Sequence, residues 1–293
     1  MMSLETLIAD LEQDRSLIEP AGLRQRIEAL DRLEAYILDV QGQDGRAEAT
    51  VEAGPCDRAR AIAARLEAIN YELYRAIRRD IMRGARPDSL LQWVSGSGPD
   101  RRATTPSNGD GYDYLDVLVG GVLQFELPDI EVAEPGAEMV SYQPTPARHI
   151  FDVIGRAALT EQDVLVDLGS GLGHVPLLAS ICTGARSIGI ELEAAYVECA
   201  RRSARALNLT RVAFMQQDAR AADLSSGTVF YLYTPFIGTI LRTVLDSLRR
   251  EAARREIRIC TYGPCTPTVA EERWLEVVGP LEPERVAIFR SRA

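Results

Sequence analysis

The sequence predicts an α/β fold: a doubly wound, mostly parallel seven-stranded sheet with an antiparallel C-terminal hairpin, preceded by a helical N-terminal region. Two observations predict it. Residues 1–94 place apolar side chains at the three- and four-residue steps of amphipathic helices. From about residue 140, short apolar runs alternate with longer amphipathic segments, which is the pattern of strand–helix–strand crossovers in a parallel sheet.

Three amphipathic helices are expected in the N-terminal region, over residues 4–13, 23–40 and 56–84. Gly84 and Pro87 mark the end of the third helix, because glycine commonly follows a helix and proline cannot continue one.

The chain is expected to have four parts. The stretch 95–111 is rich in Ser, Gly, Pro, Asn and Asp and predicts a linker or mobile loop. The stretch 112–125 fits a helix, although its run DVLVGGVLQF also fits a strand, and 127–138 predicts a loop. The parts are therefore a helical region (1–94), the linker (95–111), a connecting or lid segment (112–139) and a ligand-binding domain (140–293).

Strands and helices then alternate to the C-terminus. The helices are expected at 174–185, 194–209 and 238–255. The strands are expected at 162–169, 186–193, 211–219, 227–236 and 256–264, with 274–280 and 284–292 as the closing antiparallel pair.

Composition narrows the function. The formal net charge is −10, which argues against nucleic acid as a partner because a phosphate backbone is bound by a basic face. The sequence has no apolar run of about 18 residues, which a membrane span needs, and its start does not resemble a secretory signal. We expect a cytoplasmic protein that acts on a small molecule or on another protein.

Residue usage removes several chemistries. All 33 basic residues are arginine, so neither a lysine Schiff base nor a phosphate-loop lysine is available. The chain has five scattered cysteines without a CxxC pair and only two histidines. That set does not match the spacing of a zinc site, and we expect no metal and reduced, mostly buried thiols.

The stretch VLVDLGSGLGHVPLLAS, residues 164–180, joins the first expected strand to a helix. Open α/β sheets bind their ligands at this position. Gly169 allows a tight turn, Gly171 lets a ligand approach the backbone, and Gly173 opens the helix whose first N–H groups face the pocket. Asp167 precedes the turn and Ser170 lies within it, and both are expected to contact the ligand.

The glycine spacing separates two ligand classes. A dinucleotide site has the pattern GxGxxG, but His174 stands where its third glycine would be. The spacing with Asp167 in front resembles motif I of the class I S-adenosylmethionine-dependent methyltransferases. Within that class, VDLGSGLGHVPLLAS together with GIELE resembles the non-SET, seven-strand histone-lysine methyltransferases. That family's Asn-Asn-Phe-type segment is replaced by residues 233–236, so the acceptor is not carried over.

The resemblance implies S-adenosylmethionine as the cofactor and further binding residues. Glu191 ends the next strand, where a carboxylate accepts ribose hydroxyls. Asp218 matches the position that binds the adenine amino group, with Leu192 and Ala219 beside the ring. Upstream, Tyr142 and Thr145 match the family's cofactor loop, Tyr142 packing on the methionine end and Thr145 bonding its carboxylate. Thr145 and the proline after it also fit a helix N-cap followed by a first helical residue.

The reaction implied by the resemblance is an in-line methyl transfer, for which the protein mainly positions the acceptor and excludes water. Tyr233, Tyr142 and His149 are the candidate catalytic residues, Tyr233 because an aromatic ring suits a sulfonium. Tyr231, Thr234, Phe236 and Tyr262 are further candidates for the acceptor pocket. Two alternatives stay open: a non-catalytic cofactor-binding or scaffold protein on the same fold, and an NAD-dependent oxidoreductase.

Overall fold

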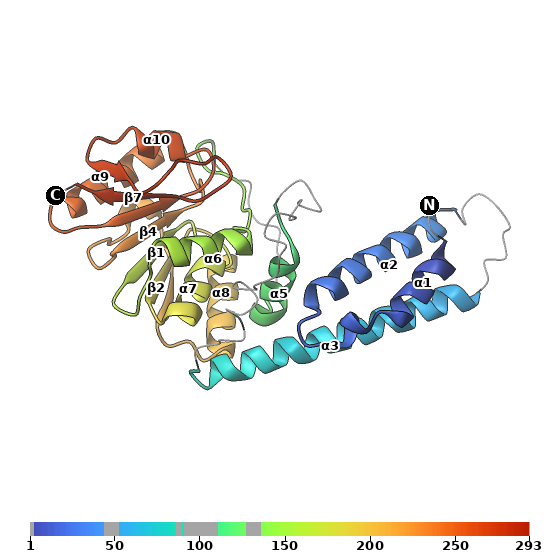
Figure 1. The fold of residues 1–293 in the computed structure, drawn as a ribbon. Coiled ribbons are helices and arrows are strands. Elements are labelled where there is room, and N and C mark those ends of the chain that lie inside the picture. The colour runs from blue at the N-terminus through green and yellow to red at the C-terminus, as the bar shows by residue number, and fades with distance from the viewer. Residues whose placement is uncertain (1–2, 44–52, 86–89, 91–110, 127–135, 293) are drawn as a thin grey trace. The chain divides into compact units, whose positions relative to one another are not determined.

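The computed structural model describes residues 3–43, 53–85, 90, 111–126 and 136–292 (Figure 1). The chain forms two compact units, Met1–Ile77 and Arg78–Ala293. The domain boundaries expected from the sequence stay a prediction. The expected linker, apart from Gly111, and most of the expected loop over 127–138 lie outside the described residues.

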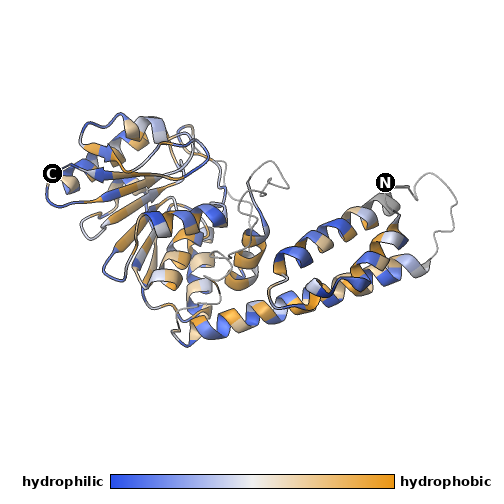
Figure 2. Cartoon of the chain, in the orientation of Figure 1, coloured by the Kyte–Doolittle hydropathy of each residue, from blue (hydrophilic) through white to orange (hydrophobic). Residues whose placement is uncertain are grey.

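The N-terminal unit is helical, as the apolar spacing predicted. Its elements are α1 (Leu4–Gln13), the 3-10 helix η1 (Arg15–Ile18), α2 (Leu23–Gln43) and α3 (Ala53–Met82), which continues past Ile77. The hydroxyl of Ser3 caps α1 by accepting from the backbone N of Thr6 at 3.2 Å. Figure 2 shows apolar and polar positions alternating around these helices. The apolar face buries Leu7, Ile8, Leu11, Leu17, Ala29, Leu33, Ala59 and Leu66.

The C-terminal unit contains α5 (Tyr114–Leu123) and α6 (Ala147–Arg156) ahead of its sheet. The stretch 112–125, for which the sequence left helix and strand open, is therefore helical. A capping box decides it: the Asp113 carboxylate accepts from the N–H of Leu115 at 2.8 Å, and the Asp116 carboxylate accepts from the N–H of Asp113 at 2.7 Å.

The sheet has seven strands in the order β3-β2-β1-β4-β5-β7-β6. The first five of these are parallel to one another, and β7 runs antiparallel to both β5 and β6. This confirms the predicted fold class, including the antiparallel C-terminal hairpin. The strands are β1 (Val164–Leu168), β2 (Arg186–Glu191), β3 (Val212–Gln216), β4 (Val229–Leu232), β5 (Arg258–Thr261), β6 (Leu275–Val277) and β7 (Ala287–Ser291).

Helices cover both faces of the sheet (Figure 1). On one face, α7 (His174–Thr183) packs against β1 and β2, α8 (Ala194–Ala206) packs against β2 and β3, and α6 packs on α7. On the other face, α9 (Gly238–Ala252) and α10 (Thr266–Ala270) contribute to one apolar cluster with the strands. A doubly wound sheet of this kind leaves its ligand site at the carboxyl ends of the strands.

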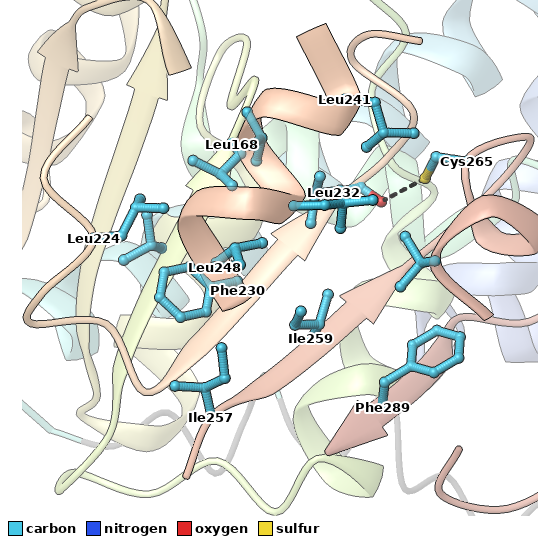
Figure 3. Close-up of a cluster of buried hydrophobic side chains, with 14 of the residues drawn as sticks. Leu168, Leu224, Phe230, Leu232, Leu241, Leu248, Ile257, Ile259, Cys265 and Phe289 are labelled. Carbon is cyan, nitrogen blue, oxygen red and sulfur yellow. Dashed lines mark hydrogen bonds between the residues drawn. The ribbon is translucent and has the colours of Figure 1, made fainter. Parts of the chain in front are cut away.

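Strand alternation sorts the residues of the sheet between these two faces. Figure 3 shows Leu168, Phe230 and Ile259 pointing toward Leu241 and Leu248 of α9. On each strand, the residues directly before and after these therefore point to the opposite face. Asp167 of β1 is one of these, and its register partners are Gly189 of β2 and Tyr231 of β4. The sheet thus sets a carboxylate and a tyrosine side by side at the ligand end.

No helix in the described ranges combines the length and the apolar character that crossing a membrane requires. All five cysteines are free, and four of them are buried.

Candidate functional site

A cavity of about 940 Å³ opens at the carboxyl ends of the parallel strands. This volume lies in the range of small-molecule and cofactor sites. Its walls come from the ends of β1, β2, β4 and β5, from the turn after β3, and from the segment 139–145 that precedes α6. Of the residues predicted to bind a cofactor, ten line it: Tyr142, Thr145, Asp167, Gly169, Ser170, Glu191, Leu192, Asp218, Ala219 and Tyr233.

The glycine turn after β1 has the backbone that the motif predicted. Gly169 and Gly171 have φ values of +89° and +51°, which residues with a side chain rarely adopt. A Cβ at Gly169 would lie 2.2 Å from the Pro235 side chain, and one at Gly171 would lie 2.0 Å from the Tyr142 ring. Gly173 is the N-cap of α7 and lies against Phe214, outside the cavity lining. The turn therefore admits Pro235 and the Tyr142 ring only because positions 169 and 171 carry no side chain.

Glu191 is tied into this turn. One carboxylate oxygen accepts from the N–H of Gly171 at 2.8 Å. The other accepts from the N–H groups of Leu192 and Glu193 at 2.7 and 2.9 Å. These bonds orient the carboxylate at the cavity wall and use most of its acceptor capacity. Its predicted bond to a ribose stays a prediction.

Asp167 and Ser170 are buried polar groups at the floor of the cavity. Asp167 is 3% exposed, and burial, with a contribution from nearby Glu191, raises the pKa of its carboxyl well above the ordinary range. The hydroxyl of Ser170 has no hydrogen-bond partner. The Ser170 hydroxyl is fully buried against Gly189, and its predicted contact with a ligand stays a prediction. Buried polar groups are normally satisfied, so the Asp167 carboxyl, which lines the cavity, points to a ligand that supplies a polar contact.

The loop before α6 supplies another wall. The ring of Tyr142 packs on Gly171 and lies 4.9 Å from the ring of Tyr196, and its hydroxyl is 3.4 Å from His174 Nδ1. Burial raises the pKa of Tyr142, so it stays a neutral phenol. The hydroxyl of Thr145 lies 3.2 Å from that of Tyr231.

The expected capping role of Thr145 is wrong. The N-cap of α6 is Pro146, which has no capping side chain, and the helix begins at Ala147. The carboxylate of Asp116 from α5 accepts from the Ala147 N–H at 2.7 Å instead. The cap comes from a residue 31 positions away, which local sequence cannot reveal.

The chain after β4 forms the wall next to the glycine turn, where Pro235 lies against Gly169. The rings of Tyr233 and Tyr262 lie 4.9 Å apart. Thr234 has φ +38°, an unusual value for a β-branched residue, and its hydroxyl donates to the Tyr262 carbonyl at 2.9 Å and accepts from the Cys265 N–H at 3.0 Å. These bonds join the loops after β4 and β5. Phe236, two residues after Thr234, is buried and forms an isolated antiparallel β-bridge with Met139.

Two predicted residues have surroundings that differ from the expectation. Both oxygens of Asp218 are engaged by the side chain of Arg220, with its Nη2 at 2.6 Å, so the residue predicted to bind adenine is already paired. His149 does not line the cavity. It is buried in α6 with its ring 4.4 Å from that of Tyr262, and burial lowers its pKa to about 4.

The sequence missed several parts of the lining. Tyr196 of α8, Arg220 and the pair Met139 and Val140 all contribute to the cavity. Tyr196 carries a weak signal, since it lies in the first turn of the helix that follows the expected ribose carboxylate. Met139 and Val140 reach the cavity through the pairing of residues 138–140 with the loop after β4. In the part of the chain that the structure describes, no group of three or more His, Cys, Asp or Glu could hold a metal ion.

Residues 135–228, about a third of the chain, match the family model described as Histone methylation protein DOT1. A search of the curated proteins found no match.

Several solved structures are similar to the chain. An RNA methyltransferase from Salinibacter ruber in complex with S-adenosyl-L-homocysteine is 27% identical, with 51% of this chain and 92% of that chain covered and a TM-score of 0.42. A precorrin-6y C5,15-methyltransferase from Geobacter metallireducens is 18% identical, covering 53% and 92%, with a TM-score of 0.40. A SAM-dependent methyltransferase from Aquifex aeolicus is 17% identical, covering 48% and 87%, with a TM-score of 0.39.

The strand order, the glycine turn after β1 and the family match agree with one another. Together they show that the C-terminal unit has the class I, Rossmann-like methyltransferase fold, as the sequence predicted.

Proposed function

We propose that this protein is an S-adenosylmethionine-dependent methyltransferase that binds its cofactor in the cavity at the glycine turn. The observation that carries the proposal is the buried Asp167 carboxyl, which lines the cavity at the glycine turn. The family match over residues 135–228 supports the same cofactor.

The residues present fit this cofactor. A buried carboxylate is costly unless a cation accompanies it, and S-adenosylmethionine carries an ammonium and a sulfonium. Asp167 would hold the cationic end. Glu191 lines the cavity at the end of β2, and Asp218 and Ala219 line it after β3. Asp218 would reach an adenine amino group only by sharing its acceptor sites with Arg220.

The tyrosines define where the acceptor would lie. When bound, the cofactor supplies a methyl group on a sulfonium, ready for displacement. Tyr142 lines the cavity beside Gly171, and Tyr233 lines it after β4 with Tyr262 next to it. Aromatic faces stabilise a cation and keep water out. They would hold an acceptor in line with the methyl carbon, which is the main contribution a protein makes to such a transfer.

Strong base catalysis is not part of the proposal. Burial lowers the pKa of both His174, which lines the cavity, and His149, which lies behind Tyr262, to about 4. Both are neutral at pH 7, and the ring of His174 packs 4.5 Å from that of Phe125. The acceptor, a small molecule or a protein side chain, would arrive in a form that needs no strong base.

Titration calorimetry with S-adenosylmethionine, S-adenosylhomocysteine and NAD tests the proposal. Binding of the first two and not the third is the expected result. Binding of NAD alone would overturn it in favour of an oxidoreductase. Methyl transfer from labelled cofactor to candidate small molecules and proteins then separates an enzyme from a cofactor-binding scaffold, which would bind the cofactor without turnover.

A further inference from the structure

Resting on the proposed function, we propose that Asp116 and Tyr112 are positioning residues for cofactor binding. They clamp the two ends of the loop 144–147 and thereby hold Thr145 at the cavity wall. Both residues precede position 135, where the family match begins, so the match does not assign them this role.

The loop cannot hold itself in place. Pro144 and Pro146 flank Thr145 and have no N–H to donate. Pro146 is also the N-cap of α6 and offers no capping side chain. Unsatisfied N–H groups at a helix start need an acceptor from elsewhere.

Asp116 supplies that acceptor. Its Oδ1 accepts from the N–H of Ala147 at 2.7 Å, and its Oδ2 accepts from the N–H of Asp113 at 2.7 Å. Ala147 is 1% exposed, so water does not replace the bond. A carboxylate at a helix N-terminus is also favoured by the helix dipole. One side chain therefore joins the start of α5 to the start of α6.

Tyr112 holds the other end of the loop. Its hydroxyl donates to the Pro144 carbonyl at 2.7 Å. With Asp116 on Ala147, the contacts lie on both sides of Thr145. Thr145 then lines the cavity, and its hydroxyl lies 3.2 Å from that of Tyr231.

The support itself is anchored. Helix α5 buries Leu115, Leu118, Val119, Val122 and Leu123 within the C-terminal unit. The hydroxyl of Ser203 on α8 donates to the Leu123 carbonyl at 2.8 Å, at the end of α5 away from the loop. Ser203 therefore offers a matched control: a buried hydrogen bond to the same helix that does not touch the loop.

The test compares D116A, D116N and S203A in the full chain by calorimetry with S-adenosylhomocysteine. D116A is expected to raise the Kd about tenfold, the usual effect of losing a hydrogen bond to a charged group. D116N keeps an oxygen for the Ala147 N–H and is expected to recover most of the affinity. S203A is expected to lower the melting temperature but leave the Kd within about twofold, because it acts on stability alone.

Hydrogen exchange supplies a readout that needs no cofactor. The amide of Ala147 is expected to exchange faster in D116A and to keep its protection in S203A. Y112F, which retains the ring, is expected to weaken binding several-fold without changing that amide. Equal effects of D116A and S203A on Kd, or unchanged protection of Ala147 in D116A, would overturn the inference. A wild-type protein that binds neither S-adenosylmethionine nor S-adenosylhomocysteine would instead overturn the proposed function, while the exchange result would still test the clamp.

Discussion

Replacing Gly171 by alanine tests how the glycine turn makes room for the cavity. The substitution has two consequences. It places a side chain at φ +51°, and it puts a Cβ 2.0 Å from the ring of Tyr142. Gly184, at the end of α7, is a matched control. Its φ is +73°, but a Cβ there would lie 3.6 Å from the nearest side chain, which is ordinary contact.

The magnitudes follow from these contacts. A left-handed alanine costs about 1–2 kcal/mol, and the lower entropy of the unfolded chain returns about 0.4–1 kcal/mol. Both variants should therefore lose about 1 kcal/mol of unfolding free energy or slightly less from the backbone. Only Gly171→Ala also displaces Tyr142. Because that ring lies on a loop that lines the cavity, the displacement should mainly reduce cofactor affinity, by tenfold or more, which is about 1.4 kcal/mol.

Urea denaturation measures the first quantity and calorimetry with S-adenosylhomocysteine measures the second. We expect similar stabilities for the two variants and a loss of affinity for Gly171→Ala alone. If Gly171→Ala binds the cofactor as tightly as Gly184→Ala, the reasoning that Tyr142 and the glycine turn form one binding wall is refuted.

Three further variants test the charges around the cavity. Asp167→Asn should raise the unfolding free energy above pH 4 while weakening cofactor binding. Burial raises the pKa of Asp167 above its ordinary 3.8, so ionising it costs stability as pH rises; a wild-type urea midpoint that does not fall relative to the variant between pH 5 and pH 8 would contradict this. Glu191→Ala should weaken S-adenosylhomocysteine binding by about 1–3 kcal/mol. A change in the calorimetric binding free energy of only a few tenths of a kcal/mol would mean that Glu191 does not bind the ribose. Because burial lowers the pKa of His149 and His174 to about 4, the stability that their neutral forms contribute is complete above pH 6.5 and is lost as pH falls toward 4. The double variant His149→Gln/His174→Gln should lose less unfolding free energy than the wild type as pH falls, as measured by urea denaturation. An equally steep loss in both proteins would contradict this explanation.

The sequence alone determined the features that depend on local pattern. The order of strands and helices, the antiparallel C-terminal pair and the turn at Gly169 and Gly171 were all predictable. Each follows from side-chain periodicity or from a backbone conformation that glycine favours. The position of Glu191 was predictable because parallel strands bring their carboxyl ends to one edge of the sheet.

Tertiary structure alone decided the contacts between distant residues. Asp116 caps α6 in place of Thr145, and His149 lies behind Tyr262 and not in the cavity lining. No periodicity reports these contacts, because they depend on how helices and loops far apart in the chain pack together. Local pattern therefore located the cavity at the glycine turn, whereas the packing of α5, α6 and the loop after β4 determined which side chains form its walls.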